Sequence, residues 1–287
     1  MKRWIALCLI ILLAAGAVVL SQKQKGDAPV TPAGLLRWVA DAEREFTRVP
    51  ASVVRLTDER EIQIGDRLAA EYSARFGPKG PGDTIMAADV QKVGLRLSAY
   101  AHRKLPYRFH YVSDNDFINS FALPGGHVFI GRGLMLLMDS EDELAAVLGH
   151  EIEHIDHYHC AERAQTQEAL GKIPLGGLIG IPIEVFEAGY SKDQELEADR
   201  EGTRLAVRAG YSPLGAIRMF ETFDGLEHAP AGRPQSPQQE LSRVAEQTLQ
   251  GYFRSHPAPS ERIAQIKRMI AEENWTNLPA QRALPHR

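Results

Sequence analysis

Basic residues are too few in this chain of 287 residues to give a surface that neutralises phosphate groups. Lysine and arginine together number 33, against 37 aspartate and glutamate residues, and the formal net charge is −4. Proteins that bind nucleic acid rely on a surplus of positive charge to displace counterions from the phosphates. The composition therefore gives no support to a nucleic-acid partner, and none is expected.

Cysteine is equally scarce. The two cysteines are Cys8, inside an apolar N-terminal run, and Cys160, far from it in the body of the chain. This spacing excludes a disulfide framework and a CxxC metal site. The overall composition, with 44% hydrophobic and 24% charged residues, is typical of a globular protein. Roughly 250 residues follow the apolar run, enough for one large domain with its own core.

The N-terminus has the pattern of a secretory signal peptide or a membrane anchor. Lys2 and Arg3 precede an uninterrupted apolar stretch over 4–20, and a polar stretch over 21–25 closes it. Such a segment is either a secretory signal peptide or an uncleaved membrane anchor. Its length is at the lower limit for spanning a bilayer, and the small residues 15–17 offer a cleavage site. We assign residues 1–25 to this segment and leave both alternatives open.

The rest of the chain is predicted to be mainly helical, with a short β region. Residues 26–49 are expected to form a linker with a short helix, 50–273 one domain, and 274–287 a tail. Alternation of apolar and polar residues predicts strands at 107–111, 119–123 and 127–131, the last two joined by a Pro-Gly-Gly hairpin signal. The Gly-rich apolar segment 173–183 is interpreted as a buried connector in preference to a lid that touches a membrane. Helical periodicity predicts helices over 35–46, 58–75, 87–103, 140–163, 191–208, 214–226, 238–249 and 260–273.

One motif in the longest central helix predicts a metal site. Residues 150–154 read His-Glu-Ile-Glu-His. Residues four apart on a helix share one face, so His150 and His154 can direct their imidazoles at one ion, while Glu151 reaches a water bound to it. The flanking residues are mostly apolar, and a buried helix with these polar groups and no metal would leave them unpaired at high cost. The spacing predicts a zinc site with Glu151 as the general base.

A catalytic zinc ion usually has three protein ligands and one position open to water, so a third ligand is required. Glu195 is the best candidate, in a predicted helix that Ser191 and Gln194 open as a capping box. Asp199 lies four residues further on the same face, where it can accept the free N–H of a ligand histidine. Glu197 is expected to lie on the opposite side and not to bind the metal.

These motifs together resemble a known family. Their order is NSFALPGG at residues 119–126, HEIEH at 150–154, ELEAD at 195–199, and SHP at 255–257 followed by Arg262. This order is similar to that of the gluzincin metallopeptidases of the HtpX, BepA and CAAX-prenyl-protease group, and it is closest to BepA-like bacterial envelope proteases. The resemblance implies a zincin-like α+β fold, mainly helical, with a small antiparallel sheet beside the metal-binding helices.

The resemblance also implies roles for particular residues. Glu195 would be the third zinc ligand and Asp199 its supporting carboxylate. The substrate would add to an edge strand formed by Asn119, Ser120, Phe121 and Ala122. Two departures from the family are Ser120, where alanine is common, and the lack of the tetratricopeptide repeats that BepA uses for partner binding. The prenyl-protease branch, with several spanning helices, does not fit a chain with one apolar run.

The other histidines and Arg262 have alternative interpretations. His157 lies near the ligand face, and a polar partner is favoured over a surplus ligand; the resemblance implies a structural role for His159. In BepA-like members a histidine at the place of His256 can approach the zinc and close the site. His256 is therefore expected either to face the metal, as an inhibitory fourth ligand or an oxyanion helper, or to cap a helix before Pro257. Arg262 is expected to form a structural ion pair.

The expected function is hydrolysis of peptide bonds by one zinc ion per chain, with unfolded or misassembled envelope proteins as the substrates. The alternative is a chaperone-like assembly factor of the outer membrane or envelope with latent protease activity. The expected location is extracytoplasmic, in the periplasm or cell envelope. The protein would be attached to the membrane by its N-terminal segment or released after cleavage of that segment.

Overall fold

The structure is a computed structural model that describes residues 56–171, 183–187, 189–227, 258–276 and 279–284. Several predicted features lie outside these residues: the N-terminal segment, the helices over 35–46 and 238–249, and almost all of the 173–183 connector. None of the helices in the described ranges is long and apolar enough to cross a bilayer.

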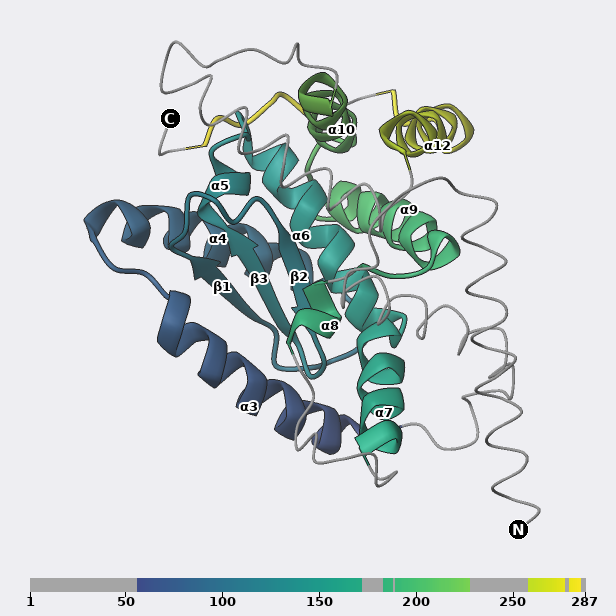
Figure 1. Ribbon diagram of the computed structural model, residues 1–287. Coiled ribbons are helices and arrows are strands. Elements are labelled where there is room, and N and C mark those ends of the chain that lie inside the picture. Colours follow the sequence, from purple (N-terminus) through teal and green to yellow (C-terminus); the bar gives the residue numbers. More distant parts are fainter. Residues whose placement is uncertain (1–55, 172–182, 188, 228–257, 277–278, 285–287) are drawn as a thin grey trace, which may run out of the picture. The chain divides into compact units, whose positions relative to one another are not determined.

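Helices dominate the described residues, as predicted, and three short strands lie among them (Figure 1). Strongly periodic helices begin and end close to their predicted limits. In chain order the elements are α3 (Asp58–Phe76), α4 (Pro81–Ser98), β1 (Arg108–Val112), β2 (Ser120–Leu123), β3 (His127–Gly131), α5 (Arg132–Met135), α6 (Glu141–Asp156), α7 (His159–Gly171), α8 (Glu184–Glu187), α9 (Lys192–Arg208), α10 (Leu214–Glu227) and α12 (Pro259–Glu272).

The sheet is mixed, which corrects the prediction of an antiparallel sheet. The strand order is β1-β3-β2, with β1 parallel and β2 antiparallel to β3. The hairpin between β2 and β3 was predicted correctly, and its turn has Gly125 and Gly126 at φ values of +78° and +105°, which suit glycine. The chain leaves β1 and returns as β2 on the far side of β3. Strand periodicity does not reveal this strand order, because the period fixes which side chains are buried and not which strands pair.

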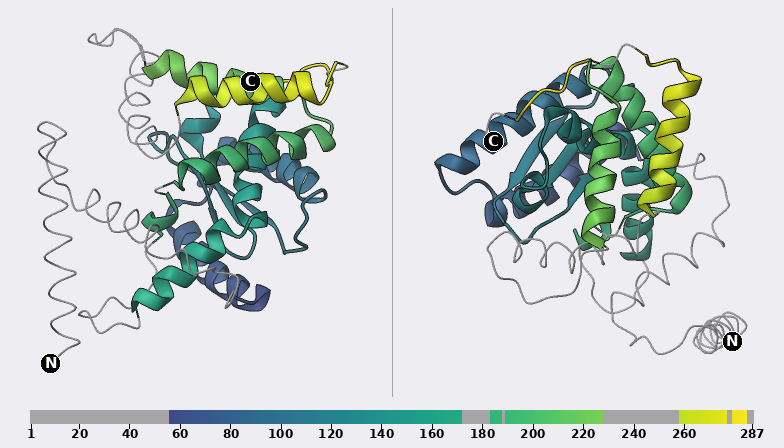
Figure 2. Two further views of the ribbon diagram at one scale, coloured as in Figure 1. Left: turned by 90° about the vertical axis from the view of Figure 1, so that its right-hand side faces the viewer. Right: turned by 90° about the horizontal axis from the view of Figure 1, so that it is seen from above.

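Different helices pack against the two faces of the sheet. Tyr72 of α3 packs edge-on against Phe121 and Phe129, at ring centroid separations of 5.3 Å for both. Strand residues alternate between the faces, so Ser120 points to the opposite face, where its hydroxyl meets α6. The sheet thus lies between α3 on one side and α4 with α6 on the other (Figures 1 and 2).

The predicted helix over 140–163 is two helices, which is a second correction. Helix α6 begins after Ser140, whose hydroxyl caps the N–H of Glu143 as expected, and it ends at Asp156. Tyr158 then has a left-handed φ of +64°, and α7 sets off from His159 in a new direction (Figure 1). The guanidinium of Arg103 lies 4.0 Å above the Tyr158 ring. A contact from a distant residue stabilises this break, so helical periodicity alone did not predict it.

Helix α9 crosses α6 at two glycines. A Cβ atom built on Gly202 would lie 2.7 Å from the backbone nitrogen of His150, and one on Gly149 would lie 2.8 Å from the carbonyl oxygen of Gly202. Both distances are shorter than real Cβ contacts, so the two backbones touch in a way that only glycine permits. This crossing brings the first turn of α9 next to the histidine motif of α6.

Candidate metal centre

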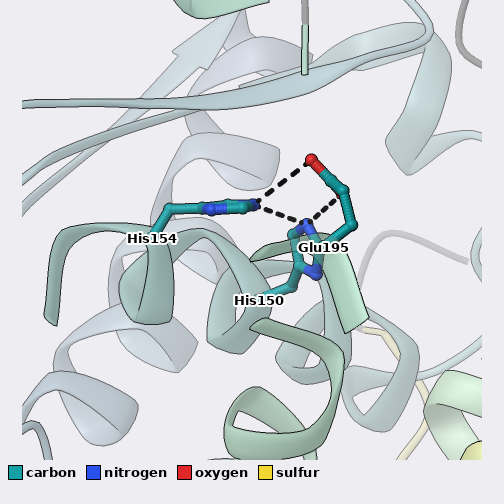
Figure 3. A group of neighbouring side chains, drawn as sticks. All are labelled: His150, His154 and Glu195. Atoms are coloured by element: carbon teal, nitrogen blue, oxygen red, sulfur yellow. Dashed lines mark hydrogen bonds and ion pairs between the residues drawn. The ribbon is translucent and has the colours of Figure 1, made fainter. Parts of the chain in front are cut away.

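Three side chains from two helices converge on one point (Figure 3). The Nε2 atoms of His150 and His154 are 3.0 Å apart. One carboxylate oxygen of Glu195 lies 3.4 Å from Nε2 of His150, and the other lies 3.7 Å from Nε2 of His154. All three residues are buried. The predicted ligand residues are therefore neighbours in space, although 41 positions separate His154 from Glu195 along the chain.

Local structure orients the carboxylate of Glu195, the third predicted ligand. Ser191 and Gln194 form the predicted capping box at the start of α9, which sets the direction of its first turn. The backbone N–H of Tyr190 donates to Oε1 of Glu195 at 2.7 Å. The ring of Tyr190 also stacks on the imidazole of His154, with centroids 4.1 Å apart. Sequence reasoning did not find Tyr190 because its contribution is a backbone donor and a ring stack, neither of which has a motif.

A second set of contacts orients the two histidines. Nδ1 of His150 lies 2.9 Å from Oδ1 of Asp199, and Arg262 donates two hydrogen bonds to the same carboxylate, at 2.6 and 2.5 Å. Since a carboxylate only accepts, Nδ1 of His150 carries hydrogen and Nε2 faces the centre. Nδ1 of His154 lies 2.9 Å from Nδ1 of His159. This last contact was missed, because it depends on the break in the helix between the two residues.

Glu151 lies beside the three converging side chains and not among them. Its Oε1 accepts a hydrogen bond from the hydroxyl of Ser120 at 2.7 Å. Burial raises the pKa of Glu151 to about 7, even though His150 and Ser120 favour the charged form. A carboxylate with a pKa near neutrality is suited to take up and release a proton. Ser120, which departs from the family pattern, therefore contacts the predicted base directly.

The surrounding charge favours a cation at the point of convergence. Burial opposes a positive charge on His150, but the carboxylates of Asp199 and Glu195 outweigh it and raise the pKa of His150 to about 10. Burial likewise opposes ionisation of Asp199, yet its pKa is lowered because Arg262 and His150 stabilise the charged form. The site therefore holds negative carboxylates in a buried place, which is unfavourable without a compensating positive charge.

The donor set fits a zinc ion. Two ligand atoms that are each bound at about 2.1 Å to one tetrahedral zinc ion lie about 3.4 Å from each other. The three separations of 3.0, 3.4 and 3.7 Å bracket that value. Two imidazoles and one carboxylate form a common ligand set of catalytic zinc sites, with a fourth position left for water.

Other residues that the sequence singled out are not part of the converging group. The carboxylate of Glu197 faces His157 and His159 at 3.6 and 3.3 Å. His157 also lies 3.3 Å from Glu153. His256 is outside the described residues, so neither of its predicted roles is tested.

The strand predicted to bind substrate is an edge of the described sheet. Asn119 accepts a hydrogen bond from the backbone N–H of Gly131 at 3.0 Å, so Ser120 and Ala122 turn their backbone groups away from β3. The carbonyl of Ala122 meets the thiol of Cys160 at 3.6 Å. Phe121 is buried against Phe129, with stacked centroids 4.9 Å apart. The Ser120 end of the strand is therefore the part that adjoins Glu151.

A mainly helical fold with a small sheet, and a buried pair of histidines joined by a glutamate, defines a metallopeptidase. Residues 85–270 match the sequence profile of peptidase family M48, and the chain belongs to that family of metal-dependent peptidases. It is 28% identical over 231 residues to the beta-barrel assembly-enhancing protease of Escherichia coli, covering 72% of this chain and 43% of that protein. It is 31% identical over 152 residues to the protein of the same name in Yersinia pestis, covering 46% of this chain and 31% of that protein.

A eukaryotic relative extends this comparison. The mitochondrial metalloendopeptidase of Schizosaccharomyces pombe is 26% identical over 213 residues, covering 71% of this chain and 58% of that protein. The chain spans less than half the length of the bacterial relatives. The family profile over residues 85–270 includes His150, His154 and Glu195, so the part of the chain that carries the metal centre is the part that matches the family.

Proposed function

We propose that the chain is a zinc-dependent endopeptidase that cleaves unfolded or misassembled proteins of the cell envelope. The convergence of His150, His154 and Glu195, with Glu151 beside them, is the observation that carries the proposal. His150, His154 and Glu195 would hold the ion, and Asp199 would orient His150. When bound, zinc supplies a Lewis acid that lowers the pKa of bound water to about 7 and polarises a carbonyl group.

Side chains and backbone groups of the chain then transfer the proton and bind the substrate. Glu151 takes a proton from the attacking water and passes it to the leaving amine. The hydroxyl of Ser120 holds the Glu151 carboxylate in place while this happens. Asn119, Ser120, Phe121 and Ala122 would receive an extended peptide as an added strand, with the outward backbone groups of Ser120 nearest the base. Binding through backbone groups selects extended chains, and folded proteins do not offer them.

The names of the relatives support the choice of substrate. One is described as a beta-barrel assembly-enhancing protease and another as a mitochondrial metalloendopeptidase. By analogy, the proposed substrates are envelope proteins that fail to fold or assemble. The proposed location is the periplasm or cell envelope, with the N-terminal segment as membrane anchor if it is not cleaved. The alternative is a chaperone-like assembly factor with latent protease activity, and His256 as an inhibitory ligand would fit that alternative.

One substitution separates hydrolysis from metal binding. Glu151→Gln removes the proton acceptor and leaves the three ligands intact, so the variant should keep about one zinc per chain and lose hydrolysis of casein. His154→Ala and Glu195→Ala should lose most of the metal. Metal content is measured by atomic absorption and hydrolysis by release of labelled peptides.

The matched control is Glu71→Gln, an exposed residue of α3, which should change neither quantity. Substantial casein cleavage by the Glu151→Gln variant would contradict the assignment of the base. Full biological function in a strain that carries only Glu151→Gln would favour the assembly factor over the protease.

A further inference from the structure

Helix α4 exposes large apolar side chains to solvent. Among the described residues, most of the exposed large hydrophobic side chains belong to this helix and the residue that follows it: Ile85, Leu95 and Tyr100 are 52, 52 and 48% exposed. The opposite side of the helix packs against β1 and α6. A single exposed apolar residue is ordinary, but several along one helix indicate a contact surface.

The same side of α4 carries positive charge and no negative charge. Both acidic residues of the helix, Asp83 and Asp89, are buried, whereas Lys92 and Arg96 are exposed. The ammonium group of Lys92 pairs with Glu141 at 2.6 Å, so this lysine also neutralises a neighbouring carboxylate. The exposed side of the helix is therefore both apolar and cationic.

A second guanidinium group lies beside that of Arg96. The guanidinium carbons of Arg96 and Arg282 are 5.2 and 5.0 Å from the centroid of the Tyr211 ring. A Cβ atom built on Gly210 would lie 3.0 Å from Nη2 of Arg96 and 3.9 Å from Nη2 of Arg282, so both groups border the same point. Within the described ranges neither guanidinium pairs with a carboxylate. Two adjacent positive charges of this kind favour an anion next to them.

One donor of this arginine pair lacks an acceptor. Nη1 of Arg282 is buried and has no hydrogen-bond partner in the part of the chain that the structure describes. Nε of Arg96, in contrast, donates to the carbonyl of Ala209 at 2.7 Å, which orients its guanidinium group. A buried donor without an acceptor is unfavourable. Because a planar guanidinium group matches the geometry of phosphate oxygens, the pair fits a phosphate group.

We propose that the α4 face, which comprises Ile85, Lys92, Leu95, Arg96 and Tyr100 together with Arg282, docks on a bilayer surface that contains anionic phospholipids. The apolar side chains would enter the boundary between headgroups and acyl chains, and the two arginines would bind lipid phosphates. A free phosphate ion would use the arginines and leave the apolar side chains in water. The inference goes beyond the proposed peptidase function and does not depend on it.

Fluorescence on vesicles of two compositions tests the proposal. The vesicles contain phosphatidylcholine alone, or phosphatidylcholine and phosphatidylglycerol at about two to one. The full-length chain carries an environment-sensitive label at Gln91→Cys, an exposed position of α4. On the anionic vesicles its emission should shift to the blue, and quenching by nitroxide lipids should be at least about threefold stronger than on the neutral vesicles. Equal responses to both vesicles would overturn the proposal.

The matched control is a label at Glu71→Cys, an exposed position of α3, which should respond equally to the two vesicles. Cys8 is present in both labelled chains, so it does not contribute to the difference between them, and Cys160 is buried. A difference of the same size at the α3 label would overturn the assignment to α4.

Substitutions separate the contribution of charge from that of apolar contact. Arg282→Gln should raise the phosphatidylglycerol content required for half of the response about fivefold, as expected for one cation at the surface. Arg67→Gln removes the same charge from an exposed position of α3 and should have little effect. Leu95→Gln changes no charge and no buried side chain, and it should weaken the response by a similar factor. This variant keeps the test decisive if an arginine variant fails to fold.

Two outcomes would assign the α4 face to another partner and overturn the proposal. The first is thermal stabilisation of the wild type by inorganic phosphate, absent in Arg282→Gln, together with no response of the α4 label to vesicles. That result would indicate a soluble phosphate compound as the ligand. The second is a blue shift of the α4 label that grows with protein concentration in detergent without lipid, which would indicate a second copy of the chain.

Discussion

Asp199 joins three helices through one carboxylate. It accepts from His150 of α6 and from Arg262 of α12, and it lies on α9 itself. Asp199 and Arg262 are both buried, with side chains 2% exposed. Such a pair is costly to break, since the partner that remains keeps its charge away from water. The ion pair therefore ties α12 to the metal centre and holds His150 in one orientation.

Removal of Arg262 should destabilise the protein strongly. Arg262→Met keeps much of the apolar stem but leaves the Asp199 carboxylate without its strongest partner, and the expected loss is about 3–5 kcal/mol in the free energy of unfolding. Urea denaturation followed by circular dichroism measures it. Arg268→Met, on the exposed side of the same helix, is the control and should change stability by less than about 0.5 kcal/mol. An equal effect of the two substitutions would contradict the role of the ion pair.

At the scale of elements, the crossing of α6 and α9 decides whether the ligands meet. Gly149 and Gly202 allow the backbones to touch, and the ligand residues lie within two turns of that point. A methyl group at either glycine must push the helices apart, because the nearest atoms are backbone and cannot rotate away.

Gly202→Ala should therefore damage the metal site more than the fold. The expected result is a loss of about 1–3 kcal/mol in stability from overpacking. Zinc affinity should weaken, and hydrolysis should fall by about 100-fold, as a shift of about 1 Å in a reacting group typically causes. Gly225→Ala is the matched control, since a Cβ there meets nothing within 4 Å in α10. The control should be neutral or slightly stabilising. Unchanged zinc affinity in Gly202→Ala would contradict this account.

The sheet carries a pair of histidines that should make stability depend on pH. Nε2 of His110 on β1 lies 2.9 Å from Nδ1 of His127 on β3, and Nε2 of His127 lies 2.9 Å from a carboxylate oxygen of Asp66 on α3. Only one proton fits between two nitrogens that face each other. Burial, the neighbouring His127 and Arg108 lower the pKa of His110 to about 4.

The sign of the effect follows from proton uptake. Between pH 6.5 and about 4 the unfolded chain binds a proton at this position and the folded protein does not. The free energy of unfolding should therefore fall as the pH is lowered through that range. His110→Gln removes the titrating group and should flatten this part of the curve, measured by urea unfolding at several pH values. An unchanged slope in the variant would assign the pH dependence to other groups.

At the scale of the whole molecule, the segment near the C-terminus supports the start of α6. The carbonyl of Arg282 accepts from the backbone N–H of Glu141, and Ala283 forms an isolated bridge with Ser140. Leu284 is 1% exposed and belongs to the core. These contacts lie within the stretch 274–287, which was predicted as a tail, and they hold the first turn of the helix that carries the histidine motif.

Leu284→Ala should thus destabilise the whole domain. The loss of buried methyl groups and the cavity left behind are expected to cost about 2–5 kcal/mol. Leu214→Ala is the control, because Leu214 is 37% exposed and should cost much less. Thermal unfolding of both variants provides the comparison. Equal melting temperatures would show that the segment does not contribute to the core.

The sequence by itself determined the features that depend on neighbours along the chain. The spacing of His150 and His154 places them on one helix face, and the capping box at Ser191 starts α9, since both patterns complete themselves within about two turns. Periodicity likewise identified most helices and the three strands. It predicted a helix over 87–103, whereas α4 spans Pro81–Ser98 and begins at a proline, which suits the first position of a helix.

Only the tertiary structure decided the features that join distant residues. These are the position of β3 between β1 and β2, and the contacts of Ser120 with Glu151 and of His159 with His154. The physical reason is that such contacts arise from helix crossings and strand pairings between segments far apart in sequence. Local conformational propensity differs little between these arrangements, whereas close packing of the whole core stabilises one of them.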